Sequence, residues 1–481
     1  MKKRLAMLLA LVLLLGLCAC AAGGDAAEPA APVEGRAQSG FRVGYARVSI
    51  QPTEELPLGG YGNTTSRIST GFLNYLYATC IAITDEQDNT VLLFTTDEIR
   101  SSAQITSDVR AELKSLTGVP EDHIMVAGTH SHSTPDIASA TDAATKRFEN
   151  YMKNQLVLCG QQALEDQKNA KVFTNSVDVA GLNFVRHYLL EDGSYAGSNF
   201  GDFSAAPIKQ HATEADPTMY VIKFAREGAQ DIVMLNWRVH PVLTGGMNKY
   251  DISSDFIGEM RDQIESKTDT LVAYFQGDAG NINPTSMIDG ETLTDDYRMY
   301  GQMVGSYAIG ALNDMTQVEP GLIQTKQIQV AGEVNHSTDE LYDKANELSQ
   351  MWNSGSYDRE TIAEEGKPYG IRSAYQAVAI VRRAKMAKTL DLELNVIAVG
   401  DSLGFVTAPY EMFDTNGAAI RAASPYPMTM VLGYCNDALG YIPSAFGYEY
   451  TCYESDTSNF APGTGELLQD TFISALNELH G

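Results

Sequence analysis

Short apolar runs rich in β-branched and aromatic residues alternate with amphipathic stretches along almost the whole chain. The apolar runs are bounded by turn residues and cover 41–50, 76–85, 90–97, 123–130, 217–225, 231–240, 270–278, 390–400, 403–409 and 428–434. The stretches with helical spacing cover 104–117, 144–167, 255–267, 294–315, 337–353, 371–388, 412–423 and 464–479. Strands of this kind must be covered by helices or by another sheet, so the pattern predicts an α/β (mixed α+β) fold with mixed β-sheets flanked by helices.

Two further segments do not fit the strand and helix pattern. Residues 186–216 are polar and glycine-rich, which favours a long functional loop or lid. Residues 325–390 carry two helix patterns and no candidate chemistry, and we expect a subdomain there. Because the candidate functional residues are spread from 130 to 454, we expect 41–481 to form one large catalytic unit.

The charge balance excludes one class of function. The chain of 481 residues has 34 Lys and Arg against 61 Asp and Glu, a net charge of −27. A protein that binds nucleic-acid phosphates needs a basic surface to displace counterions. We therefore expect no nucleic-acid partner, and an acidic surface typical of soluble secreted proteins.

The N-terminus predicts a compartment outside the cytoplasm. Residues 1–4 carry three positive charges, residues 5–17 are apolar, and Cys20 follows Ala19, as in a bacterial lipoprotein signal. We expect residues 1–19 to be removed, Cys20 to carry the lipid that holds the protein on the membrane, and residues 20–40 to be a flexible tether. An ordinary secretory signal cleaved nearby is the alternative. Outside the cell, a disulfide between Cys435 and Cys452 is conceivable.

Two histidines follow the apolar run that ends near residue 127. In Gly128-Thr129-His130-Ser131-His132-Ser133 the imidazoles are two positions apart. In extended backbone such side chains project to the same side, so His130 and His132 are predicted to meet just beyond a strand end. A histidine-containing surface loop is the alternative reading.

Other strand ends also carry groups that can bind a metal. His240 ends one run, Glu411 follows another, and Tyr441 and Asp278 follow two more. Each has a structural explanation of its own, such as a capped helix or a half-buried tyrosine. Taken together they supply the nitrogen and oxygen ligands that Zn²⁺ accepts.

Several motifs in the same order along the chain make it resemble the neutral/alkaline non-lysosomal ceramidase family from residue 41 almost to its end. These motifs are Gly128-Thr129-His130-Ser131-His132-Ser133, Asn236-Trp237-Arg238-Val239-His240-Pro241, Ser254-Asp255, Gly277-Asp278, Pro409-Tyr410-Glu411, Gly440-Tyr441 and Tyr453-Glu454.

The resemblance implies an amide hydrolase with one zinc ion. Its ligands would be His130, His240, Glu411 and Tyr441. The expected catalytic residues are His132 beside the metal, Arg186 in a region where relatives carry an active-site arginine, and Asp278, which could orient ligands or substrate.

Two departures from the family pattern bear on the substrate. Gly280 stands where ceramide-cleaving members have a serine in a GDVSPN-like run, and the sequence does not include the immunoglobulin-like C-terminal domain that members usually carry. Water activated by zinc provides a nucleophile without that serine. We therefore expect a ceramide-like N-acyl lipid or a smaller acyl-amine as the substrate.

Two other functions compete with this one. Gly400-Asp401-Ser402-Leu403-Gly404 matches the string of a GDSL-type serine esterase, but strand-like runs flank it on both sides and predict a hairpin turn instead. A lipoprotein that binds a ligand without catalysis is the other alternative, and the missing serine favours it. The sequence as a whole predicts an extracytoplasmic, lipid-anchored zinc amidohydrolase.

Overall fold

A computed structural model of the chain describes residues 40–61, 67–137, 142–199, 201, 203–204 and 206–481. The predicted signal peptide and nearly all of the tether lie outside the described residues. Residues 39–481 form one compact unit. Its strands are β1 (Phe41–Ser49), β2 (Gly71–Phe72), β3 (Tyr77–Thr84), β4 (Thr90–Thr96), β5 (Ile124–Gly128), β6 (Lys168–Asp178), β7 (Phe184–Val185), β8 (His187–Leu190), β9 (Tyr195–Gly197), β10 (Ile208–His211), β11 (Thr218–Arg226), β12 (Ile232–Trp237), β13 (Asp251–Ile252), β14 (Leu271–Gln276), β15 (Ile282–Asn283), β16 (Thr316–Val318), β17 (Ile323–Glu333), β18 (Thr389–Val399), β19 (Leu403–Thr407), β20 (Glu411–Met412), β21 (Met428–Leu432) and β22 (Tyr441–Ile442).

Two mixed sheets form the centre of this unit. In the described residues the larger sheet has nine strands in the order β14-β12-β11-β6-β1-β3-β4-β5, with β16 beside β6, and the second sheet has the order β17-β18-β19-β21. Most neighbours are antiparallel, whereas β4–β5, β12–β14 and β19–β21 are parallel. All ten predicted strand runs are present, and the mixed α/β prediction is confirmed.

The two sheets pack face to face between layers of helices. Neighbouring residues on a strand point to opposite faces, so Leu93 and Ile397 share the core between the sheets. Leu92 instead packs towards α1 (Ala103–Thr117) and α2 (Ala143–Glu165), and Val396 towards α8 (Asp414–Ala423) and α11 (Thr464–His480). This alternation requires four layers, helix, sheet, sheet and helix.

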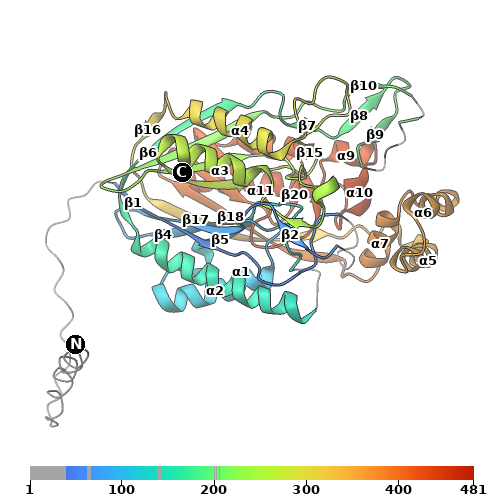
Figure 1. Ribbon diagram of the computed structural model, residues 1–481, viewed down its shortest axis with the longest axis horizontal. Coiled ribbons are helices and arrows are strands. Elements are labelled where there is room, and N and C mark those ends of the chain that lie inside the picture. Colours follow the sequence, from blue (N-terminus) through green and yellow to red (C-terminus); the bar gives the residue numbers. More distant parts are fainter. Residues whose placement is uncertain (1–39, 62–66, 138–141, 200, 202, 205) are drawn as a thin grey trace, which may run out of the picture. The chain divides into compact units, whose positions relative to one another are not determined.

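The helices are those predicted, with additions. In Figure 1, α1 and α2 lie below the strands, and α3 (Phe256–Thr268) and α4 (Tyr297–Ala311) lie above them. Both pairs cover the outer face of the larger sheet, the first over β3, β4 and β5 and the second over β11, β12 and β14. In the part of the chain that the structure describes, the remaining helices of eight residues or more are α5 (Tyr342–Asn353), α6 (Arg359–Gly366) and α7 (Ala374–Arg383). Two short helices, α9 (Ala445–Glu449) and α10 (Tyr453–Thr457), follow β22.

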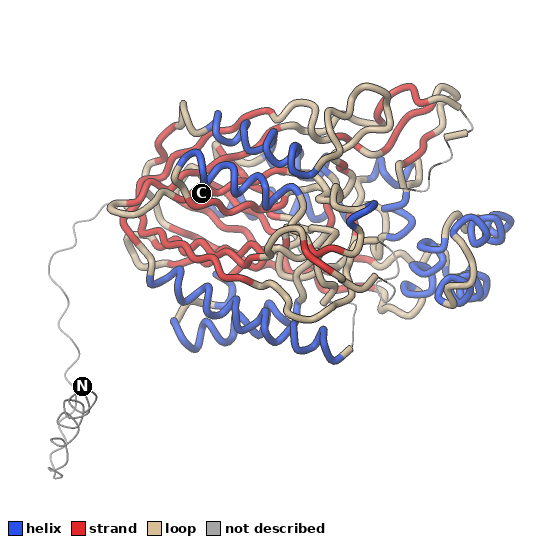
Figure 2. The backbone as a smooth tube through the Cα atoms, viewed as in Figure 1, coloured by secondary structure: helices blue, strands red, loops and turns tan. Residues whose placement is uncertain are grey.

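The segment between β17 and β18 is a helical insertion. It contains α5, α6 and α7, which stand together at one end of the strand layers (Figures 1 and 2). The expectation of a subdomain with two helix patterns describes α5 and α7, while α6 and the strand β17 at its start were not predicted. We call residues 334–388 the helical insertion below.

Two expectations about loops have opposite outcomes. The turn around Ser402 joins the antiparallel strands β18 and β19, so the predicted hairpin is confirmed. Its first residue, Gly400, has a φ of 55°, which is why glycine is favoured there.

The prediction of a long loop over 186–216 is wrong, because β8, β9 and β10 form a small antiparallel sheet. β8 and β9 are only four and three residues long, and β10 is mostly polar and open to solvent, so none of them gives a clear strand pattern in the sequence.

The cysteines of the described residues form no disulfide. All four thiols are free and buried, namely Cys80, Cys159, Cys435 and Cys452, so the suggested Cys435–Cys452 disulfide is wrong.

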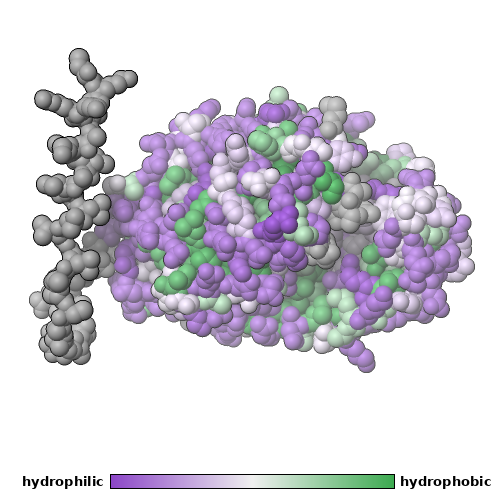
Figure 3. All heavy atoms as spheres, turned by 60° about the horizontal axis from the view of Figure 1, so that its bottom comes forward, coloured by the Kyte–Doolittle hydropathy of each residue, from purple (hydrophilic) through white to green (hydrophobic). Residues whose placement is uncertain are grey.

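Among the helices of the described residues, none combines the length and the apolar content needed to span a membrane. On the face shown in Figure 3, hydrophilic side chains dominate and apolar ones form small groups between them.

Candidate metal centre

The carboxyl ends of several parallel strands meet at one place. The Gly128 amide at the end of β5 donates to the Tyr434 carbonyl (3.0 Å), and the Gly433 amide after β21 donates to the Gln276 carbonyl at the end of β14 (2.9 Å). Side chains that follow these strands therefore converge, as ligand sites do in α/β folds.

Three of these side chains are imidazoles. One ring nitrogen from each of His130, His132 and His240 lies within 4.8 Å of the other two. The predicted meeting of His130 and His132 is present, with 3.2 Å between their Nε2 atoms. Extended backbone is not the cause, because His130 has a φ of 67°, in the left-handed region. The strand ends at Gly128, and a turn brings the second ring back to the first.

Backbone carbonyls fix the orientation of two of the rings. His130 Nδ1 lies 2.6 Å from the Ile99 carbonyl, and His240 Nδ1 lies 3.0 Å from the Ile282 carbonyl. A carbonyl only accepts, so each Nδ1 carries the hydrogen and each Nε2 keeps its lone pair. This orientation is typical of histidines that bind a metal through Nε2.

Glu411 lies where the two Nε2 atoms point. Its Oε2 is 3.2 Å from His130 Nε2 and 3.3 Å from His240 Nε2. Glu411 is in β20, which pairs in parallel with β22 so that Glu411 is directly opposite Tyr441. The two-residue pairing therefore sets two of the predicted ligands side by side.

The pKa values of His132 and His240 favour neutral imidazoles beside an ionised Glu411 carboxylate. Burial lowers the pKa of His132 well below its usual value, and the neighbouring imidazoles lower it further. Burial and Arg186 lower the pKa of His240 to about 4. Burial alone would raise the pKa of Glu411, but the imidazoles hold it well below its usual range. At neutral pH these residues turn lone pairs and a negative charge towards one point, which fits a divalent cation.

Tyr441 is held from the other side by Arg186. The Arg186 Nη2 donates to the Tyr441 hydroxyl (3.2 Å) and to the Gly280 carbonyl (2.9 Å). Burial, and next the Glu411 charge, raise the pKa of Tyr441 well above its usual value, although Arg186 opposes them. Tyr441 is therefore a neutral phenol at this place unless a cation binds it.

Sequence reasoning assigned no role to the residues that hold Arg186. Glu454 accepts from Arg186 Nε at 2.6 Å through one oxygen and contacts His187 Nε2 at 2.7 Å through the other. The Tyr450 hydroxyl lies 2.6 Å from His187 Nδ1. Glu454, His187 and nearby Cys452 also lie close enough to hold an ion, but these hydrogen bonds already occupy the carboxylate and the imidazole. The Tyr453-Glu454 motif was the only signal for this group in the sequence.

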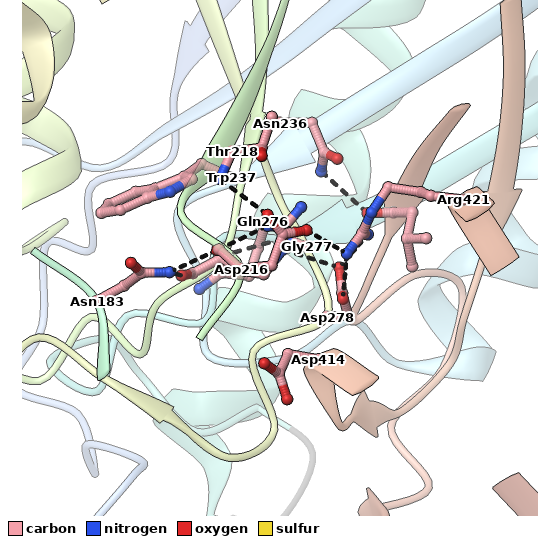
Figure 4. A network of polar contacts seen from close by, with 12 residues as sticks. Asn183, Asp216, Thr218, Asn236, Trp237, Gln276, Gly277, Asp278, Asp414 and Arg421 are labelled. Carbon is pink, nitrogen blue, oxygen red and sulfur yellow. Dashed lines mark hydrogen bonds and ion pairs between the residues drawn. The ribbon is translucent and has the colours of Figure 1, made fainter. Parts of the chain in front are cut away.

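Asp278 is not part of the metal group, by which we mean His130, His132, His240 and Glu411. Its carboxylate pairs with Arg421 Nη1 at 2.8 Å and with Arg238 Nε at 3.3 Å, and its side chain is completely buried. Figure 4 shows Asp278 and Arg421 facing each other in a network that also includes Asp216. Asp278 therefore fastens α8 to the end of β14 below the site.

The residue at the position of the family serine is fixed by its backbone. The Gly280 amide donates to the Met412 carbonyl at 2.8 Å, and a Cβ on Gly280 would collide with the carbonyl oxygen of Glu411. The backbone here leaves no room for a side chain, so the absence of serine is part of the local geometry.

A cavity of about 550 Å³ opens from this group. His130, His132, Glu411 and Tyr441 line one part of it. The helical insertion supplies a further set of lining residues, namely Trp352, Asn353, Tyr375, Val378 and Arg382. The sequence reading found no candidate chemistry in this insertion, because only the fold shows that it faces the cavity.

The comparisons with known proteins agree with the resemblance seen in the sequence. The family model described as "Neutral/alkaline non-lysosomal ceramidase, N-terminal" matches residues 41–366. A crystal structure of neutral ceramidase from Pseudomonas aeruginosa is 17% identical, has a TM-score of 0.68, and is matched over 92% of this chain and 75% of that chain. A ceramidase complexed with C2 gives 17% identity, a TM-score of 0.68, and coverage of 92% and 76%.

A search of the curated proteins gives no match. At 17% identity the two solved structures establish the fold, whereas the family model covers well over half of the sequence. The chain therefore belongs to the neutral/alkaline non-lysosomal ceramidase family.

Proposed function

We propose that this protein is a zinc-dependent hydrolase that cleaves the amide bond of an N-acyl lipid or a smaller acyl-amine. The observation that carries the proposal is the position of Glu411 Oε2, which lies 3.2 and 3.3 Å from two Nε2 atoms whose lone pairs are fixed towards it. His130, His240 and Glu411 would hold the ion, with Tyr441 beside them. The adjoining cavity has room for a small substrate.

The roles of the chain's own residues follow from their contacts. A zinc ion held by His130, His240 and Glu411 would polarise the amide carbonyl and would lower the pKa of bound water to about 7. His132 is half-buried and neutral, and its Nε2 at the edge of the group can hold a proton or transfer one to the leaving amine. Arg186 positions the Tyr441 hydroxyl beside the ion site, where it can donate a hydrogen bond to the carbonyl oxygen and stabilise charge there.

Metal analysis joined to an activity screen tests the proposal. We expect about one zinc per chain in the purified protein, and hydrolysis of N-acyl amides that a chelator abolishes and zinc restores. His130→Ala and His240→Ala should each lose the metal and nearly all turnover, while His480→Ala, an exposed histidine outside the cavity, should keep both. Retention of zinc and rate in both site variants would sink the proposal.

Non-catalytic ligand binding is the second candidate, and Gly280 favours it. A protein without the family serine could keep the fold and bind an amide without cleaving it. Metal-free purified protein that holds a small molecule tightly would support this function.

The proposed location is outside the cytoplasm, on a membrane, through a lipid on Cys20. The support is the sequence of residues 1–20. Cell fractionation tests it, because Cys20→Ser should move the protein from the membrane fraction to the soluble fraction. Equal membrane association of the two proteins would contradict the anchor.

A further inference from the structure

The outer part of the cavity has an aromatic wall that leads towards the metal group. Trp352 and Tyr375 come from the helical insertion, with ring centroids 5.6 Å apart. Tyr375 and Tyr453 follow at 5.9 Å, and Tyr453 and Tyr441 at 5.7 Å. All four rings line the cavity, and such a wall suits an apolar acyl group.

A cation from the insertion lies in the same cavity. Arg382 donates from Nε to the Asn459 side-chain oxygen (2.8 Å) and from Nη2 to the Thr457 carbonyl (2.7 Å). Both acceptors are neutral, and within the described residues no carboxylate oxygen lies within 4.0 Å of the Arg382 guanidinium. These two contacts hold the guanidinium of this exposed residue in place without pairing it with a carboxylate.

The other charged groups that line the cavity already have partners. Arg100 pairs with Asp136, with Nη2 2.9 Å from a carboxylate oxygen. Glu411 faces the imidazoles, and Asp437 accepts from backbone amides, including that of Ala103 at the start of α1. Among the charged groups that line this cavity, Arg382 is therefore the cation with which a negatively charged ligand can pair. The chain as a whole has a net charge of −27.

The guanidinium groups of Arg383 and Arg100 also act on Arg382, and the charge of Arg383 adds to its attraction for an anion. Burial lowers the pKa of Arg382, and the charges of Arg383 and Arg100 lower it further. Arginine stays charged despite such shifts, so like charges close to it favour the binding of a negative group. A carboxylate fits the planar guanidinium through charge-assisted hydrogen bonds.

We infer that the substrate of this site is an amide that bears a carboxylate, such as an N-acyl amino acid, with the carboxylate bound by Arg382 and the acyl chain on the aromatic wall. The inference rests on the proposed amide hydrolysis. In the reaction the C–N bond breaks and a C–O bond to water forms. The amine takes a proton, so N-octanoylglycine and water give octanoate and glycine.

Two substrates that differ in charge provide the test. N-octanoylglycine and N-octanoylethanolamine have the same acyl chain and amide, and differ in a carboxylate against a hydroxymethyl group. The zinc-loaded protein should cleave the glycine amide with the higher kcat/KM. In Arg382→Gln, kcat/KM for that substrate should fall about tenfold to a hundredfold, the effect of losing hydrogen bonds to a charged group.

Matched variants separate a direct role of Arg382 from a structural one. Arg382→Gln should leave kcat/KM for N-octanoylethanolamine within about twofold, since this substrate has no charge to pair. Arg382→Lys should restore part of the preference for the glycine amide. Lys385→Gln removes a charge just beyond α7, outside the cavity lining, and should change neither substrate. Equal losses on both substrates in Arg382→Gln would overturn the inference.

Binding to the metal-free protein distinguishes this inference from the proposed function. By calorimetry in chelator, N-octanoylglycine should bind more tightly than N-octanoylethanolamine, and Arg382→Gln should weaken only the former, about tenfold or more. If the zinc-loaded protein cleaves no amide but this binding pattern holds, hydrolysis fails and the anion site stands. If amides are cleaved but Arg382→Gln binds both ligands as the wild type does, the anion site fails and hydrolysis stands.

Discussion

Glu98 is a carboxyl group buried beside the candidate metal centre, with no cation partner among the described residues. Its Oε1 accepts from the Thr96 hydroxyl at 2.5 Å, while Oε2 has no hydrogen-bond partner among the described residues. Burial raises the pKa of Glu98 to about 8, and the nearby Asp97 adds to the shift. Since the folded-state pKa lies above the unfolded value of 4.5, the stability from this group is complete below pH 4.5 and is lost as the pH rises through 8.

Glu98→Gln should remove most of this pH dependence. Between pH 6 and pH 9 we expect the wild type to lose on the order of 2 kcal/mol of unfolding free energy more than Glu98→Gln does. Thermal or denaturant unfolding at a series of pH values measures the difference. Parallel stability profiles for the two proteins would show that Glu98 keeps an ordinary pKa.

Gly280 allows a test of whether the family serine can be restored. Gly280→Ser should not create a serine mechanism, because its Cβ would collide with the Glu411 carbonyl and displace that ligand. We expect weaker zinc binding and a lower unfolding midpoint, measured by metal titration and melting. Gly310→Ser is the control, since a Cβ there meets nothing within 4 Å. A gain of turnover in Gly280→Ser with normal zinc affinity would contradict this prediction.

The sequence predicted which residues form the site better than it predicted the contacts that orient them. His130, His132, His240 and Glu411 converge, because groups that follow parallel strands meet at one edge of a sheet. The ring orientations depend on the carbonyls of Ile99 and Ile282, and the anchoring of Arg186 depends on Glu454. These contacts join distant parts of the chain, so no local pattern indicates them.

Helix α8 is fastened to the end of β14 by a buried ion pair. Both Arg421 Nη atoms contact the Asp278 carboxylate, at 2.8 and 3.0 Å, and the exposed fractions of the two side chains are 7% and 0%. Removing one partner of such a pair leaves a buried charge, although Arg238 would still contact Asp278.

Arg421→Met should therefore lower the unfolding free energy by about 3 kcal/mol. Chemical denaturation measures the effect. Arg147→Met is the matched control, because the Arg147–Glu54 pair is exposed and its loss should leave the unfolding midpoint close to that of the wild type. Similar midpoints for all three proteins would mean that the buried pair does not hold α8.

Two long strands that the sequence did not predict, β6 and β17, are rich in polar residues. β6 pairs with β1, β11 and β16 within the large sheet, yet many of its side chains are only partly buried. β17 lies at the edge of the second sheet and alternates polar and apolar residues weakly. Both strands are defined by backbone hydrogen bonds to the neighbouring strands. Such bonds do not depend on the side chains, so the pattern of apolar residues does not reveal them.

The candidate ligand groups lie where separate layers meet, so an ion bound there would join parts of the chain that lie far apart in sequence. His130 follows a strand of the large sheet, and Glu411 follows the second sheet. An ion that binds only the folded state stabilises it in proportion to the logarithm of its concentration.

Zinc removal should therefore lower the stability of the whole unit. At a free zinc concentration about 1,000 times the dissociation constant, we expect a gain of about 4 kcal/mol over the metal-free protein. Melting with added zinc and with chelator measures this shift. His130→Ala should show no such difference, and an equal zinc effect in that variant would place the stabilising ion elsewhere.

The helical insertion leaves and rejoins the sheet at one point. Glu333 and Thr389, on either side of it, are paired directly opposite each other in β17 and β18. A segment with adjacent ends can be exchanged for another of different length without altering the strand register around it. Related chains could thus acquire new substrate preferences by replacing this cassette, while the imidazoles and the carboxylate stay in place.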